Sequence, residues 1–288
     1  MGIYKIYIYQ SVVSAFRAGT GTALHPSTPF SVFDSFTQKE PVAMTQAQLT
    51  PQQQLHVNQA KLDFAKAFRV LKNTRTLSAS NTLQAYLRVP ESDLVVALHA
   101  PSPWADNEDI QAVFASYDGV IYLDESVEGS SPLSGSKAGG NGKRYAAVFQ
   151  RRPEVNVVIH VHTAWLGGWA SSHRVLPIRY AASQRLTLAR ELPIYIDRRQ
   201  PEADFIVEKI EENPHTPAIL EANGGSTFWG TSIIQSAKLI LLIEEGAYFQ
   251  GLAESLGGSQ EFGAGVLEQQ WKMTGLWSQG QKLLEAVA

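Results

Sequence analysis

The chain has 288 residues, of which 44% are apolar and 18% are charged, and its formal net charge is −3. This composition is ordinary for a globular protein and lacks the basic excess that partners such as nucleic acid or anionic membranes require. There is no cysteine, which excludes disulfides, thiolate metal sites and cysteine nucleophiles. No apolar run approaches the roughly 20 residues that span a bilayer, and no signal peptide is evident, so we expect a cytoplasmic protein.

Residues 1–43 differ in composition from the rest of the chain. After a short aromatic alternation they are rich in Ser, Thr, Gly and Pro, and Met44 then begins a Gln-rich segment. Two interpretations stay open. In the first, Met44 is the natural start and residues 1–43 are a misassigned extension. In the second, these residues form a flexible arm or a strand exchanged within an oligomer. We expect residues 44–288 to form a single domain with a helical C-terminal tail.

Apolar periodicity predicts the elements of the first half. Between Leu55 and Leu71 several apolar residues recur at i, i+3 and i+4, which favours an amphipathic helix. The pattern then predicts strands at 83–87, 93–99, 113–114 and 119–123, a loop rich in Ser, Gly and Pro at 126–142, and a short helix at 143–150.

The segment 153–163 is mostly β-branched and apolar and ends in two histidines. Side chains alternate between the two faces of a strand, so His160 and His162 are predicted to point one way and Ile159 and Val161 the other. Two imidazoles at i and i+2 can share one metal ion through their neutral ring nitrogens. The alternative is a pair of polar residues at a strand end, hydrogen-bonded to their neighbours.

The second half mixes strands and helices without strict alternation. Thr163 can cap a helix that follows the histidine strand. Further elements are predicted as strands at 176–182 and 193–196, a helix at 202–212, a strand at 217–222 that 227–229 continue, and a long buried helix at 233–256. This mixture predicts a sheet with helices packed on its faces, an α/β or α+β sandwich.

The segment from Phe149 to Thr163 resembles the class II aldolase/adducin family, which reads aromatic-x-x-Arg-Pro-Asp-x-x-Ala-Val-Val-His-x-His-Ser/Thr at this point. Weaker resemblance extends from about Leu77 to Phe249. It implies a central, mostly antiparallel sheet flanked by helices, and a homotetramer with sites at subunit boundaries. It also implies a divalent metal, typically zinc, that stabilises an enediolate oxygen of a small oxygenated substrate.

Two positions depart from the pattern of that family. The family takes a third histidine ligand from an Asn-His-Gly turn, where this chain has Gly224 between Asn223 and Gly225. The family also places a catalytic carboxylate about nineteen residues before the first histidine, where this chain has Asn141. An amide cannot act as a general base, and the phosphate-binding Ser-Gly-Asn motif is not evident at residues 80–84.

Other residues are candidates for completing a metal site. His99 ends a strand that leads toward the site in the family order, and His173 follows the helix after the histidine strand. Glu221 is discounted, because alternation puts it on the opposite face from Gly224. The remaining histidines, His25, His56 and His215, are expected at the surface, and Glu91 and Asp93 are expected to be solvated.

The turn at Asn223, Gly224 and Gly225 also has a possible binding role. Exposed N–H groups of a glycine-rich turn can bind an anionic oxygen. The glycine-rich loop 134–143 could do the same, with Lys137 or Lys143 adding charge. The alternatives are a tight turn that needs positive φ and a mobile loop.

Three functions remain open. The first is a metal-dependent lyase, of aldolase or decarboxylase type, that acts next to a carbonyl of a small molecule and uses His160 and His162. The second is a non-catalytic binding or assembly module on the same fold. The third is another metal chemistry with His99 or His173 as a new ligand.

Overall fold

The computed structural model describes residues 49–117, 121–123 and 144–287. The N-terminal extension 1–43 and the loop 126–142, which carries Lys137 and Asn141, lie outside the described residues. No helix within the described ranges is long and apolar enough to cross a membrane.

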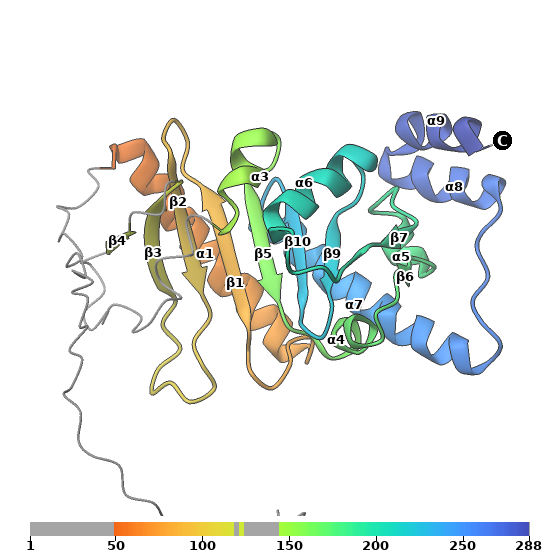
Figure 1. Cartoon of the computed structure of the whole chain (residues 1–288), viewed down its shortest axis with the longest axis horizontal. Coiled ribbons are helices and arrows are strands. Elements are labelled where there is room, and N and C mark those ends of the chain that lie inside the picture. The colour runs from red at the N-terminus through yellow and green to blue at the C-terminus, as the bar shows by residue number, and fades with distance from the viewer. Residues whose placement is uncertain (1–48, 118–120, 124–143, 288) are drawn as a thin grey trace, which may run out of the picture. The chain divides into compact units, whose positions relative to one another are not determined.

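A central sheet of eight strands has the order β4-β3-β2-β1-β5-β10-β9-β8 (Figure 1). Neighbouring strands are antiparallel except β8 and β9, which are parallel. Their bounds are β1 Leu83–Arg88, β2 Leu94–His99, β3 Gln111–Ser116, β4 Ile121–Leu123, β5 Val157–Val161, β8 Ile194–Tyr195, β9 Ala218–Glu221 and β10 Ser226–Gly230. The structure therefore confirms the mostly antiparallel central sheet that the family resemblance implies.

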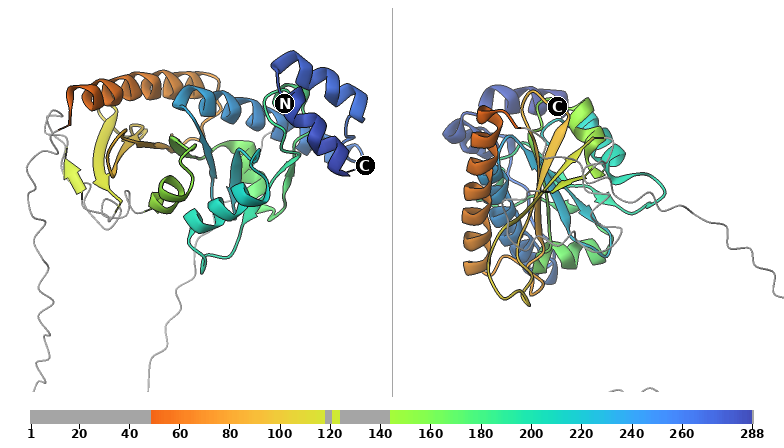
Figure 2. Two further views of the ribbon diagram at one scale, coloured as in Figure 1. Left: turned by 90° about the horizontal axis from the view of Figure 1, so that it is seen from above. Right: turned by 90° about the vertical axis from the view of Figure 1, so that its left-hand side faces the viewer.

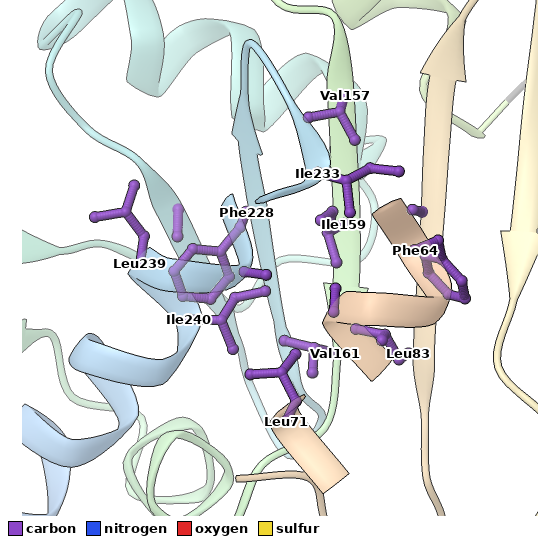
Figure 3. Packing of buried hydrophobic residues seen from close by; sticks show 14 of the residues in the cluster. Phe64, Leu71, Leu83, Val157, Ile159, Val161, Phe228, Ile233, Leu239 and Ile240 are labelled. Atoms are coloured by element: carbon purple, nitrogen blue, oxygen red, sulfur yellow. The ribbon is translucent and has the colours of Figure 1, made fainter. Parts of the chain in front are cut away.

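Helices cover both faces of this sheet (Figure 2). The long helices α1 (Pro51–Asn73) and α7 (Ile233–Ser255) pack on one face, and the shorter α3 (Ala146–Arg151) and α6 (Glu202–Glu212) pack on the other. The first interface is the larger of the two cores. Phe64 of α1 and Ile240 of α7 meet Ile159 and Phe228 of the central strands there (Figure 3).

The remaining helices and strands surround the carboxyl end of the histidine strand and one edge of the sheet. They are α4 (Ala164–Ser171), β6 (Leu176–Pro177), α5 (Ala181–Gln184), β7 (Glu191–Leu192), α8 (Ala264–Thr274) and α9 (Trp277–Val287). Strands β6 and β7 form a separate two-stranded sheet. Leu267 and Trp271 of α8 are buried, and the Trp271 indole N–H donates to the carbonyl of Gln184.

Two of the predicted strands are wrong. The predicted strand 176–182 stops after two residues, because Pro177 has no N–H to donate and the chain turns into α5. Residues 227–229 do not continue the strand before them. They belong to β10, which turns back and pairs antiparallel with β9.

The N-terminus of α4 is capped from another helix. Thr163 occupies the N-cap position but makes no side-chain cap, contrary to prediction, and its hydroxyl donates instead to the Glu244 carboxylate at 2.6 Å. The same carboxylate accepts the backbone N–H groups of Trp165 at 2.8 Å and Leu166 at 2.9 Å. A buried carboxylate of α7 thus satisfies the first free amides of α4, where the positive end of the helix dipole stabilises it.

Candidate functional site

A row of polar residues crosses four neighbouring strands. Gln84 of β1 is the register partner of both His99 on β2 and His160 on β5, and His160 is in turn the partner of Thr227 on β10. Directly opposed residues of antiparallel strands share a face, so all four side chains lie on the face that α3 and α6 cover in part. This row is the foundation of the candidate site.

The two histidines of β5 converge as the alternation predicts. Nε2 of His160 lies 3.1 Å from Nε2 of His162, and the ring planes cross at 72°. Two nitrogens that bind one cation at about 2.0–2.1 Å, with angles between 90° and 109°, lie about 2.9–3.4 Å apart. The observed separation therefore fits two positions of a shared divalent ion.

Glu221 is part of this site, so the expectation that it faces away is wrong. Its Oε1 lies 2.8 Å from Nδ1 of His160 and accepts the Thr227 hydroxyl at 2.6 Å. The alternation was counted back from Gly224, but β9 ends at Glu221 and the turn that follows breaks the two-residue period. A carboxylate at the end of the apolar strand Ala218–Glu221 was itself a signal, since buried acids need partners.

This contact fixes the tautomer of the first histidine. The Nδ1–H group of His160 donates to the Glu221 carboxylate, which leaves Nε2 with a lone pair directed at His162. Burial raises the pKa of Glu221, but the hydrogen bonds from His160 and Thr227 and the charge of Arg144 outweigh it and hold this pKa well below its usual range. Burial lowers the pKa of His162 and so favours its neutral ring.

A second layer of polar side chains, absent from the sequence prediction, supports the first. Glu202 accepts Arg144 at 2.8 Å through one oxygen, and it accepts Tyr145 at 2.9 Å and Thr227 at 3.0 Å through the other. Burial, followed by the charge of Glu202, raises the pKa of Tyr145 well above its usual value, which keeps its hydroxyl protonated as a donor. Thr227 therefore links two carboxylates, those of Glu202 and Glu221.

The turn after β9 packs against the site and is not a free anion-binding loop. The N–H of Asn223 donates to Ala170 and the N–H of Gly224 donates to Glu221, so two of its three amides are already used. At Gly225 an added Cβ would lie 2.3 Å from the carbonyl oxygen of Val161 and 2.4 Å from Cδ2 of His162. Glycine is needed here because the backbone lies directly against the second imidazole.

Among the residues that the structure describes, no third protein ligand joins the pair. Within residues 49–117, 121–123 and 144–287 there is no group of three or more His, Asp or Glu side chains that could hold a metal ion. His99 is separated from His160 by the whole of β1, about 10 Å at ordinary strand spacing. His173 pairs with the Asn223 side-chain amide at 2.9 Å. The structure thus brings neither candidate into the set, and in the described part of the chain the His160–His162 pair alone has a separation that fits a divalent ion.

The other polar candidates lie away from the pair. Glu91 and Asp93 are exposed, as expected. His56 and His215 are half-buried, although the sequence placed them at the surface. Burial lowers the pKa of His215 below its usual value. The backbone at these positions packs against the domain, so the polar sequence around them was a poor guide to exposure.

Solved structures share this fold at low sequence identity. L-fuculose 1-phosphate aldolase is 18% identical with a TM-score of 0.55, and the match covers 75% of this chain and 95% of that one. The L-fuculose 1-phosphate aldolase from Glaciozyma antarctica PI12 is 15% identical with a TM-score of 0.58, covering 83% and 93%. YgbL from Escherichia coli, named as an aldolase/epimerase/decarboxylase, is 18% identical with a TM-score of 0.51, covering 76% and 99%. No curated protein sequence matches the chain.

The fold is that of solved class II aldolases. Residues 110–250 match the family described as the Class II Aldolase and Adducin N-terminal domain. This segment of the chain is therefore similar to that family. The segment includes β5, the turn at 222–225 and β10, so the histidine pair and Glu221 lie within the matched residues.

Proposed function

We propose that this protein is an atypical class II aldolase-type lyase that holds a divalent cation, such as zinc, on His160 and His162. The observation that carries the proposal is the 3.1 Å approach of the two Nε2 atoms, with Glu221 fixing the His160 tautomer from behind. The substrate class we propose is a small oxygenated molecule with a carbonyl next to the bond that is broken. The solved relatives named as L-fuculose 1-phosphate aldolase support aldol cleavage over other reaction types.

The chain's own residues would prepare the site in three ways. His160 and His162 would hold the divalent cation, which would supply Lewis-acid polarisation of a carbonyl when bound. Glu221 orients His160 and raises its basicity as a ligand. Thr227, Arg144 and Glu202 hold Glu221 in place, so its carboxylate cannot turn away from the ring.

Measurement of bound metal tests this proposal. We expect the purified protein to bind one zinc ion per chain, and the variant His160→Ala/His162→Ala to lose it. His215→Ala is the matched control, because this half-buried histidine lies outside the pair and should leave the metal content unchanged. Equal zinc content in the double variant and the wild type would refute the proposal, as would a wild type that binds no divalent ion.

A second candidate, a non-catalytic binding or assembly module, is favoured by one observation. Gly224 occupies the position of the third ligand in the family turn, and no described side chain replaces that ligand. This function predicts no bound metal and no change in behaviour when both histidines are replaced. The zinc measurement above therefore separates the two candidates.

We also propose that the protein is a homo-oligomer. The family resemblance favours a tetramer. Aromatic side chains gather on the outer faces of α4 and α7, where Trp165 is 41% exposed, Tyr248 38% and Phe249 44%. The three rings contact one another in sequence, with centroids 4.8 Å and 5.3 Å apart. Exposed patches of this kind usually mark an interface. Sedimentation of the wild type and of Phe249→Glu tests this, and a monomeric wild type would refute it.

A further inference from the structure

Two arginines flank the buried carboxylate of the candidate site. Nη2 of Arg144 lies 3.7 Å and Nη1 of Arg198 lies 3.6 Å from Oε2 of Glu221. The other oxygen of this carboxylate accepts the Nδ1–H group of His160. The Arg198 side chain is 52% exposed, whereas that of Glu221 is buried. A small ligand at the histidine pair can therefore reach the Arg198 guanidinium from the solvent.

The Arg198 guanidinium is held in one orientation by its neighbours. It lies over the ring of Tyr195, with Cζ 4.7 Å from the ring centroid, and its Nη2 donates to the carbonyl of Ala222 at 3.0 Å. Ala222 begins the turn in which Gly225 packs against His162, so the guanidinium is attached to the same turn as the second imidazole. A guanidinium that is already stacked and hydrogen-bonded loses little conformational freedom when it binds a ligand.

Arg198 keeps hydrogen-bond donors that the fold does not use. Within the described part of the chain its Nη1 makes no hydrogen bond, because the 3.6 Å contact with Glu221 is too long for one. Arg144 differs, since its Nε and Nη2 both donate to Oε2 of Glu202, at 3.0 Å and 2.8 Å. Arg198 is therefore the arginine that can donate to a ligand, and its planar guanidinium matches the geometry of a carboxylate.

The charges at the site favour an anionic group when a divalent ion is bound. The two arginines balance the carboxylates of Glu202 and Glu221, and His160 and His162 would bind a metal as neutral rings. A divalent ion on the pair would therefore add two positive charges that no described side chain at the site neutralises. Glu221 would repel an anion, but its Oε1 already accepts hydrogen bonds from His160 and Thr227, which offset part of its charge.

We propose that Arg198 binds a carboxylate of the substrate, and that the substrate is an oxo acid whose carbonyl lies at the histidine pair. The proposal rests on the proposed function, because it takes the reacting carbonyl to lie at a cation on His160 and His162. It narrows the small oxygenated substrate to a molecule with a carboxylate close to the carbonyl, as in a 2-oxo acid. Arg198 is in this case a residue that determines substrate specificity.

Binding of pyruvate and of hydroxyacetone to the zinc-loaded protein, measured by ligand-observed NMR, tests this inference. The two probes carry a carboxylate and a CH₂OH group, respectively, next to the same carbonyl. We expect the wild type to bind pyruvate about 10- to 100-fold more tightly, the usual effect of a hydrogen bond to a charged group. Arg198→Gln should remove this preference and leave hydroxyacetone binding unchanged. Arg198→Lys keeps the charge but not the planar group, and should retain part of the preference.

Arg199→Gln is the matched control, because Arg199 is exposed, adjoins Arg198 and pairs with Asp197. It should leave the affinities for both probes unchanged. Zinc content is measured on every sample, and Arg198→Gln should bind as much zinc as the wild type.

A zinc-loaded wild type that shows no preference for pyruvate overturns this inference and leaves the proposed function standing. Equal weakening of both probes in Arg198→Gln, equal effects of Arg198→Gln and Arg199→Gln, or loss of zinc from Arg198→Gln also overturns it. A wild type that binds no divalent ion overturns the proposed function, and this inference with it.

Discussion

Replacement of Gly225 by alanine tests the packing of the turn against the site. The new Cβ would lie 2.4 Å from Cδ2 of His162, and the ring would have to retreat by about 1 Å to reach an ordinary carbon–carbon contact. It would also lie 2.3 Å from the carbonyl oxygen of Val161, which belongs to β5 at the centre of the sheet and has little room to move. We expect a loss of about 3 kcal/mol in the free energy of unfolding, at the upper end for overpacking.

The displaced ring should also bind metal less tightly. A shift of His162 breaks the 3.1 Å approach to His160, and we expect zinc affinity to fall about 10- to 100-fold, as when supporting residues of metal sites are changed. Chemical denaturation gives the stability, and competition with a chelator of known affinity gives the zinc affinity of the folded variant.

Gly224→Ala is the control for this experiment. Its added Cβ would lie 3.2 Å from the Glu221 carbonyl oxygen and 3.4 Å from the Glu221 Cβ, so only a small adjustment is needed. The variants His162→Ala and Gly225→Ala, alone and combined, form a double-mutant cycle. Gly225→Ala should cost about 1 kcal/mol less in the free energy of unfolding when the imidazole of His162 has been removed. If Gly225→Ala and Gly224→Ala differ by less than about 0.5 kcal/mol, and the cycle shows no coupling, the proposed contact with His162 is wrong.

Three further predictions concern single carboxylates and a half-buried histidine. Glu221→Gln should keep the fold but lower zinc affinity about 10- to 100-fold, because His160 loses its charged partner; unchanged affinity in a chelator competition would contradict this. Glu244→Gln should cost about 2 kcal/mol in chemical denaturation, because the charged cap of α4 is lost, whereas the exposed neighbour Glu245→Gln should cost little. The pKa of His99 falls from 6.5 to about 4 in the folded protein, so only the unfolded chain takes up this proton between those values and stability falls as the pH is lowered through that window. His99→Gln should remove up to about 3 kcal/mol of this loss. If the free energy of unfolding depends on pH in the same way in the wild type and in His99→Gln, the assignment of the loss to His99 is wrong.

The sequence predicted those parts of the molecule in which a local period decides the structure. Alternation along β5 placed His160 and His162 on one face, and the structure brings their Nε2 atoms within 3.1 Å. Helical periodicity predicted residues 202–212, the bounds that α6 has. These patterns succeed because each element buries one face, and a shift of one residue would expose it.

Contacts between elements distant in sequence could not be predicted in this way. Glu221 reaches His160 only because β9 and β5 both flank β10, an order that no local pattern encodes. Glu244 caps α4 although it lies 78 to 81 residues further along the chain than the groups that it accepts. Glu202 accepts hydrogen bonds from Arg144 and Tyr145, which are adjacent in the chain, and from Thr227 on β10. In each case the sequence showed an acidic residue inside or beside an apolar element. A buried acid requires a partner, but the sequence does not identify that partner.

The cap at Glu244 links the end of the histidine strand to α7, one of the two long helices that pack on the opposite face of the sheet. Thr163 follows His162 directly, and its hydroxyl is anchored on α7. Any change that tilts or slides α7 therefore pulls on the backbone next to the second imidazole. Substitutions on the outer surface of that helix can in this way alter the geometry of the histidine pair, so the stability of the scaffold and the arrangement of the candidate site are linked.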